Sequence, residues 1–184
     1  ERVKLIKRLQ EERYMPLKLI RGVLDADPER ARALIELEDR ILEHATAAAQ
    51  AGEHMGRAEA QRRFGVPRNV LDRLAELEVL SPTSRGYDAD DVAIIKAISR
   101  FRAGGYDEAL GFTVYDTLRY REALAPLVEE EVRTLLERLA GEVEPERAVE
   151  IVASGAEPLR ELIGAMHSKL LLAELRRQRR GRRA

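Results

Sequence analysis

Six polar side chains between residues 57 and 85 could bind nucleic acid. They are Arg57, Arg62, Arg68, Asn69, Arg73 and Arg85. Guanidinium groups bind phosphates and base edges, and a helix in the major groove reads those edges. Arg57 and Arg68 lie near expected helix starts, where free backbone amides also bind phosphate. The segment therefore predicts contacts with DNA, and the alternative is an exposed helix face balanced by Glu59, Asp72 and Glu76.

Other reactive side chains form no recognisable site. The chain has no cysteine, which excludes a disulfide framework, a thiolate metal site and a cysteine nucleophile. His44, His54 and His167 are the only histidines, and none has a partner at metal-ligand spacing. No Ser/His/acid arrangement, glycine-rich phosphate loop or paired-carboxylate motif is visible. We therefore expect a protein that is not an enzyme and that holds neither a cofactor nor a metal.

Basic and acidic segments alternate along the chain, although its net charge is only −1. The balance is +4 over residues 1–24, −5 over 25–55, +2 over 56–87 and −6 over 116–175, and residues 176–184 hold six arginines and no acid. Such alternation indicates nucleic-acid-binding segments separated by segments with another role. The alternatives are solvated helix faces and a solubilising tail.

The composition predicts helices. Of the 184 residues, 45% are hydrophobic and only 4% aromatic, and Ala, Leu, Glu and Arg are abundant. No run approaches the roughly 20 apolar residues of a membrane span, and no signal peptide is visible. We therefore expect a cytoplasmic protein with no membrane partner.

Apolar periodicity and turn residues place the elements. They predict helices over residues 28–50, 57–64, 68–80 and 88–104, and three more helices within 113–175. Gly65 and Gly104 mark helix ends, Asp88 can cap a helix, and Pro158 is expected to open the last one. A turn at Val66-Pro67 and a short loop over 81–86 separate the middle helices. This order is the outline of a winged helix-turn-helix. After Leu175 we expect a disordered basic tail.

Two parts of the chain resemble regulators of the MerR family. The segment over residues 3–14 looks like the first of the two helices that follow the wing of such a regulator. The segment after it, with Leu17, Ile20 and Leu24 at helical spacing, looks like the second. Residues 65–82 are similar to the family's turn and recognition helix, and residues 85–92 resemble its wing and the entry to its third helix. The resemblance covers residues 1–24 and about 56–110, and a weak internal repeat relates the two parts.

The resemblance implies winged-helix units on a dimer that binds a promoter palindrome. It also implies that a first helix-turn-helix and wing would precede residue 1. The helix over 28–50 stands where the family places its antiparallel dimerisation helix. Its seam residues are Leu34, Leu37, Ile41 and His44, at the 3/4 spacing of a coiled coil. A stripe this narrow can equally pair with another helix of its own chain.

The second winged unit departs from the family pattern. Where the family has threonine, arginine and an aromatic on the recognition helix, this chain has Val70, Asp72 and Arg73. An aspartate on that face repels phosphate, and the wing is short. The unit could therefore serve interaction or ligand binding instead. Farther along, a set of apolar residues could line an effector pocket or form an ordinary helical core: Tyr115, Leu118, Tyr120, Leu124, Met166 and Leu170.

The sequence thus predicts an all-α protein with winged helix-turn-helix elements. Its expected segments are a remnant winged helix over 1–24, a dimerisation helix over 25–54, a second winged helix over 55–112, a helical effector domain over 113–175 and a tail over 176–184. The expected function is homodimeric, promoter-binding regulation of transcription, open to a small-molecule effector. The alternative is a protein- or ligand-interaction module that does not bind DNA.

Overall fold

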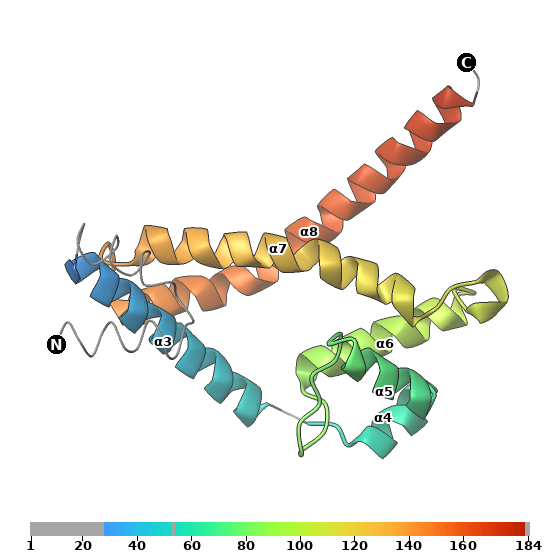
Figure 1. The fold of residues 1–184 in the computed structure, drawn as a ribbon, viewed down its shortest axis with the longest axis horizontal. Helices are drawn as coiled ribbons and strands as arrows, with labels where there is room; N and C mark the ends of the chain where they lie inside the picture. Colours follow the sequence, from blue (N-terminus) through green and yellow to red (C-terminus); the bar gives the residue numbers. More distant parts are fainter. Residues whose placement is uncertain (1–27, 53, 183–184) are drawn as a thin grey trace. The chain divides into compact units, whose positions relative to one another are not determined.

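The computed structural model describes residues 28–52 and 54–182, and in them the chain is helical. The elements are α3 (Pro28–Ala51), α4 (Arg57–Phe64), α5 (Arg68–Glu76), α6 (Ala89–Ala103), the short 3-10 helix η1 (Glu108–Leu110), α7 (Val114–Leu139) and α8 (Pro145–Gly181) (Figure 1). This part of the chain has isolated β-bridges but no strands. The all-α class is therefore confirmed. The expectations for residues 1–24 lie outside the described residues.

The described residues form two compact units. The central unit comprises residues 43–52 and 54–137, and the terminal unit comprises residues 28–42 and 138–182.

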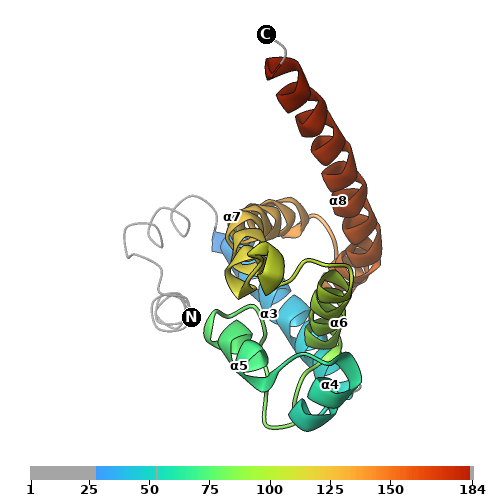
Figure 2. The ribbon, with the colours of Figure 1, turned by 90° about the vertical axis from the view of Figure 1, so that its right-hand side faces the viewer.

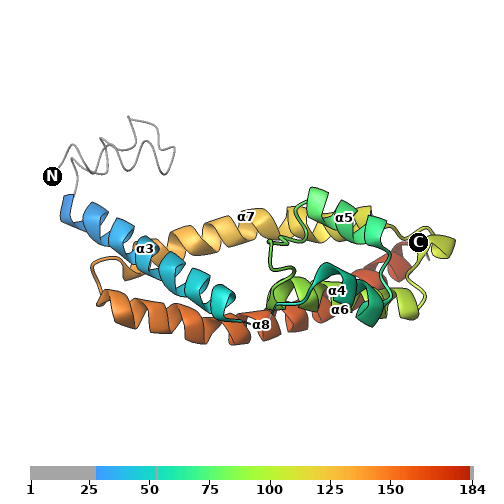
Figure 3. The same cartoon turned by 90° about the horizontal axis from the view of Figure 1, so that it is seen from below.

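The core of the central unit lies between α4, α5 and α6. Ala60 of α4, Leu71 and Leu74 of α5 and Ile95 of α6 are fully buried in one cluster. Figures 2 and 3 show α4 beside α6, and the Ser99 hydroxyl of α6 donates to the Phe64 carbonyl at 2.6 Å. Burying one leucine or isoleucine side chain contributes about 1.5–3 kcal/mol, so this cluster fixes the three helices together.

The turns that frame α5 differ at its two ends. At the first, Gly65 adopts a left-handed conformation and closes α4, and Pro67 precedes α5, as the sequence predicts. At the second, the helix ends at Glu76, four residues earlier than expected. The amides of Val79 and Leu80 turn back to the Leu74 carbonyl at 2.9 and 3.2 Å. After this reversal Leu80 is buried in the core.

The loop between α5 and α6 is fixed by β-bridges. Met55 and Tyr87 exchange two backbone hydrogen bonds of 2.9 and 3.0 Å, and Thr83 pairs with Gly86. Gly86 has a φ of 105°, and a Cβ there would lie 2.3 Å from the Met55 carbonyl oxygen. Only glycine allows this approach, so the short loop predicted over 81–86 is held against the start of the unit.

Two aspartates begin α6. Asp88 caps the helix, as the sequence predicts, because its carboxylate accepts from the Asp91 amide at 2.9 Å. Asp91 is 4% exposed and accepts from the Ser81 amide at 2.9 Å, while its Oδ2 has no partner among the described residues. Burial raises the pKa of Asp91, and the neighbouring charges of Asp88 and Asp90 raise it further.

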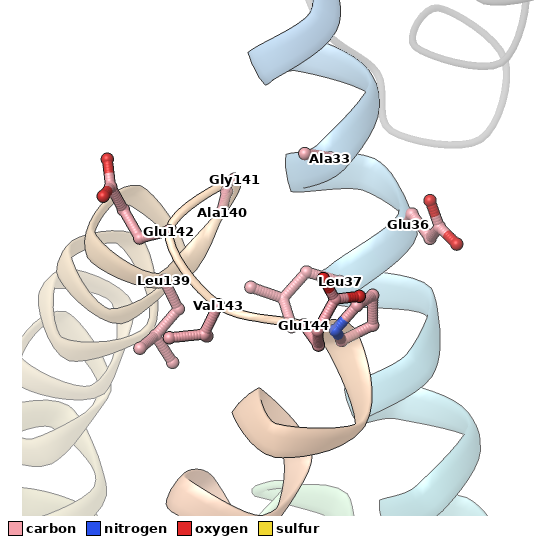
Figure 4. Close-up of a pocket in the computed structure, with 10 residues that line it drawn as sticks. Ala33, Glu36, Leu37, Leu139, Ala140, Gly141, Glu142, Val143 and Glu144 are labelled. Carbon is pink, nitrogen blue, oxygen red and sulfur yellow. The ribbon is translucent and has the colours of Figure 1, made fainter.

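In the terminal unit, α3 lies beside the turn that joins α7 to α8. A hollow of about 400 Å³ is bounded by Ala33, Glu36 and Leu37 of α3 and by residues 139–145 (Figure 4). Arg40 of α3 pairs with Glu146 of α8 at 4.0 Å. Figure 4 shows the carboxylates of Glu36 and Glu142 pointing away from each other. These two carboxylates therefore do not converge on the hollow.

The C-terminal part of the chain corrects two expectations. Only two helices, α7 and α8, span residues 114–181 instead of three helices and a disordered tail. Pro158 lies inside α8 instead of starting a helix, because the residues on both sides of it are strong helix formers. Arg176, Arg177, Arg179 and Arg180 belong to α8. Arg177 pairs with Glu174 at 2.6 Å and lowers the pKa of that glutamate to about 2, and cations suit a helix C-terminus.

Candidate nucleic-acid interface

Two helix N-termini of the central unit are free of side-chain caps and carry arginine at their first position. Gly56 precedes Arg57 at the start of α4, and Pro67 precedes Arg68 at the start of α5. Neither cap residue supplies a side-chain hydrogen bond to the helix amides. Both arginines are exposed. Each end therefore combines unoccupied amides, a positive helix dipole and a cation, which together suit a phosphate.

The start of α6 is different in chemistry. It is capped by Asp88 and holds Asp90 and Asp91 in its first turn. The Asp88 carboxylate accepts a hydrogen bond from the Asp91 amide, and carboxylates at a helix start repel an incoming anion. Glu59 lies in the first turn of α4 and offsets part of the charge of Arg57, whereas α5 has no acid in its first turn. Of the three helix starts in this core, those of α4 and α5 therefore suit a phosphate better than that of α6.

Arg57 and Asp72 both act on a buried tyrosine between these elements. Tyr87 is almost completely buried, and burial is the main reason that the pKa of its hydroxyl is raised. The charge of Arg57 lowers this pKa, and the charge of Asp72 raises it. The start of α4 and the middle of α5 thus lie near the same hydroxyl.

The other charged and polar side chains of α4 and α5 set the charge of this surface. Arg62 and Arg63 occupy the last turn of α4, and the guanidinium of Arg63 lies 5.7 Å from the centre of the Phe64 ring. Arg68 Nε lies 3.5 Å from Asp72 Oδ2, so the aspartate offsets part of the charge of α5. Asn69 is exposed in the first turn of α5. The exposed charge of this surface is therefore positive but moderate.

Arg73 makes contacts within the chain. Its guanidinium donates to Glu76 at 2.7 Å and to the Tyr115 hydroxyl of α7 at 2.8 Å, and it lies 5.4 Å from the centre of the Tyr115 ring. These hydrogen bonds, first that of Glu76, raise the pKa of Arg73. A DNA contact by this side chain would have to replace the bond to Tyr115.

A second contact ties α7 to the end of α5. Arg121 donates to the backbone carbonyl of Glu78 at 3.1 Å and also pairs with the Glu78 carboxylate. Sequence reasoning missed Tyr115 and Arg121 as partners of α5, because they lie 42 and 43 residues from the groups they bind. No spacing rule relates residues at such separations.

Arg85, the arginine of the expected wing, also has a partner within the unit. Its guanidinium donates to the carbonyl of Gln50, near the end of α3, at 2.9 Å. The structure thus brings Arg57, Arg68 and Asn69 to helix starts and leaves Arg62 at the end of α4. It places Arg73 and Arg85 in contacts of their own.

The expected dimerisation residues lie in different environments. Leu37 is 3% exposed in its own chain and borders the hollow of the terminal unit. Leu34 and Ile41 are half-buried, and His44 is exposed. The pairing of this stripe with a second copy stays a prediction, although Leu37 already has neighbours within the chain.

The residues expected to form a helical core or an effector pocket are mostly open to solvent. Tyr115, Tyr120, Leu124, Met166 and Leu170 are all more than two-fifths exposed. The core expectation is therefore wrong for these five residues. It failed because apolar spacing marks a face that needs a partner, without showing that the partner is in the same chain.

No protein-family model, curated protein or solved structure matches the chain. Among the described residues, no group of three or more His, Cys, Asp and Glu side chains could hold a metal ion. No helix in this part of the chain is long and apolar enough to cross a membrane.

Proposed function

We propose that this chain is a DNA-binding regulator of transcription that acts as a homodimer on promoter DNA. In this proposal the central unit is a winged helix-turn-helix similar to those of MerR-type regulators, with α4 and α5 as the helix pair and the loop over 81–87 as a short wing. The helix α5 would face the major groove, where such pairs place their second helix.

The observation that carries the proposal is the pair of helix starts at Arg57 and Arg68. Both lack a side-chain cap, and both belong to helices that one buried cluster holds in fixed geometry. Backbone amides and arginines that bind phosphates position a protein on DNA, and Asn69 beside Arg68 can reach a base edge. Rigid positioning matters because side chains on a loose helix would lose their register on the duplex.

The homodimer part of the proposal concerns α3. Two copies paired through Leu34, Leu37, Ile41 and His44 would hold two central units at about one turn of DNA, roughly 34 Å, or a multiple of it. A ligand or partner that changed this pairing would change the affinity for the promoter. The chemistry of such an effector is left open.

The test is fluorescence anisotropy of the whole chain with genomic duplex DNA over a range of salt concentrations. Each phosphate contact contributes about −0.9 to the slope of log affinity against log salt. Arg57→Gln combined with Arg68→Gln should therefore make the slope shallower by about 2. The matched control is Arg119→Gln, which removes an arginine of α7 that is 81% exposed and should leave the slope unchanged.

Binding that keeps its slope in the double variant would contradict the proposal. The same is true if binding disappears only when the arginines of α8 are replaced, because the central unit would then not be the DNA-binding part. Replacement of Arg176, Arg177, Arg179 and Arg180 by glutamine keeps good helix formers in α8 and isolates their contribution.

A second candidate function is supported by the contacts of Arg73 and Arg85. Both arginines have partners within the chain, and Asp72 lies beside Arg68 on α5. These features suit an interaction module that does not bind DNA itself. Absence of binding at low salt would favour this function, since phosphate contacts are strongest there.

A further inference from the structure

Helix α8 carries an apolar stripe for which the described part of the chain offers little cover. The α8 stripe consists of Leu159, Leu162, Ile163, Met166 and Leu170, which share one helix face through 3/4 spacing. Leu162, Met166 and Leu170 are 55%, 52% and 65% exposed. From residue 153 to residue 182, every residue except Ile163 and Glu174 is exposed.

A long helix with an exposed apolar face is unstable by itself. Isolated helices are marginal in water, and most helical stability in proteins comes from packing of the apolar face. The stripe is narrow and repeats over three turns, which is the pattern of a helix that pairs with another helix. What covers it must therefore be a helical surface of similar length.

The charges of α8 point to the partner and its direction. Residues 145–162 carry four glutamates against two arginines, a balance of −2. Residues 163–181 carry one lysine and four arginines against one glutamate, a balance of +4. Two copies of α8 in parallel would place their basic ends together, whereas an antiparallel pair sets each basic end beside the acidic start of the other.

We propose that the α8 stripe is a self-association surface on which two copies of this chain pair antiparallel. Four of the five stripe residues, Leu159, Leu162, Ile163 and Met166, are symmetric about a point between Leu162 and Ile163. An antiparallel pair centred there places Leu159 of one copy opposite Met166 of the other, and Leu170 opposite Gly155. This surface differs from the α3 seam of the proposed function, and it does not depend on whether the chain binds DNA.

The test uses disulfide trapping in the whole chain. The protein has no cysteine, so Leu159→Cys and Met166→Cys each introduce a single thiol. In the antiparallel pair, two copies of Leu159 are offset by seven residues, about 10 Å along the axis, which is too far for a disulfide. In a mixture of the two variants, the disulfide that joins one variant to the other, identified by its mass, should form on the order of tenfold more than the intermolecular disulfide that either variant forms alone.

Two outcomes would overturn the proposal. Efficient disulfide formation by each variant alone would indicate parallel pairing. Absence of intermolecular disulfides in the mixture would show that another surface, such as a segment of the same chain, covers the stripe. Neither outcome bears on DNA binding, so failure here is separate from failure of the proposed function.

Substitutions on the two faces of α8 give the matched control. Leu162→Glu places a charge in the stripe and should abolish the mixed disulfide. Leu172→Glu changes a leucine that is 48% exposed and outside the stripe, and it should leave the yield unchanged. Equal yields in the two variants would contradict the assignment of the stripe, and the far-ultraviolet circular dichroism of each variant confirms that it remains helical.

Discussion

Gly86 occupies a backbone position that no other residue could take without displacing Met55. Its positive φ and the 2.3 Å separation between a built Cβ and the Met55 carbonyl oxygen act together. We expect Gly86→Ala to lower the free energy of unfolding by about 2 kcal/mol, because strained backbone costs on this order. Urea unfolding followed by circular dichroism measures the change.

The control for this substitution is another glycine with space around it. Gly155 lies in α8, and nothing lies within 4 Å of a Cβ built there. Gly155→Ala should stabilise the helix by up to about 1 kcal/mol through helix propensity. If both variants change stability in the same direction, the close approach at Gly86 is not what restricts that position.

Asp91 should give the central unit a dependence on pH. Burial raises its pKa in the folded protein above the ordinary value of 3.8, which we take for the unfolded chain. The folded state therefore binds the proton more tightly, so this contribution to stability is complete below pH 3.8 and is lost as the pH rises through the raised pKa. As the pH rises from 3.8 through the raised pKa, the free energy of unfolding should fall more in the natural chain than in Asp91→Asn.

If the natural chain and Asp91→Asn show the same change in stability with pH, burial does not raise the pKa of the Asp91 carboxyl, and the prediction is wrong. Glu122→Gln is the matched control, since Glu122 is exposed on α7 and does not act on the pKa of Asp91.

At the scale of elements, the position of α5 depends on two leucines beneath it. Leu71 and Leu74 are buried in the core. The Leu74 carbonyl also accepts hydrogen bonds from the amides of Val79 and Leu80, where the chain reverses after the helix. Leu74→Ala should cost about 2–5 kcal/mol, the usual range for a buried leucine. Leu110→Ala, at a site that is 72% exposed, should cost little. Thermal unfolding of the two variants measures the difference, and equal losses would contradict the assignment of the core.

The elements show what the sequence could predict and what it could not. The caps and breaks were visible in residue types: Asp88 at the start of α6, Gly65 at the end of α4, and Gly104 after α6. The end of α5 was misplaced because the turn through Glu78, at a φ of 54°, carries no glycine to mark it. Pro158 was misinterpreted as a helix start because proline is common at both kinds of position.

The candidate site was predictable only in part. Arg57 and Arg68 follow turn residues, so their place at helix starts could be expected from the sequence. The contacts of Arg73 with Tyr115 and of Arg121 with Glu78 could not, because they depend on how α7 crosses α5. The burial of Asp91 had one signal, its place three residues after the Asp88 cap, where a side chain can turn back toward the preceding loop.

At the scale of the whole molecule, the chain combines a compact core with long helices that expose apolar faces. Large exposed apolar faces mark surfaces for interaction. In the proposed arrangement, the starts of α4 and α5 bind DNA and the α8 stripe binds a second copy of the chain. An antiparallel pair through α8 would join two DNA-binding units even if α3 packed only within its own chain, so the two proposals are compatible and separately testable.

The most direct measurement is amide hydrogen exchange of the whole chain with and without duplex DNA at low salt. The account predicts that DNA slows exchange in the first turns of α4 and α5, next to Arg57 and Arg68, and leaves the first turn of α6 unchanged. Slower exchange confined to the arginines of α8, or no change anywhere, would contradict the claim that the central unit binds DNA.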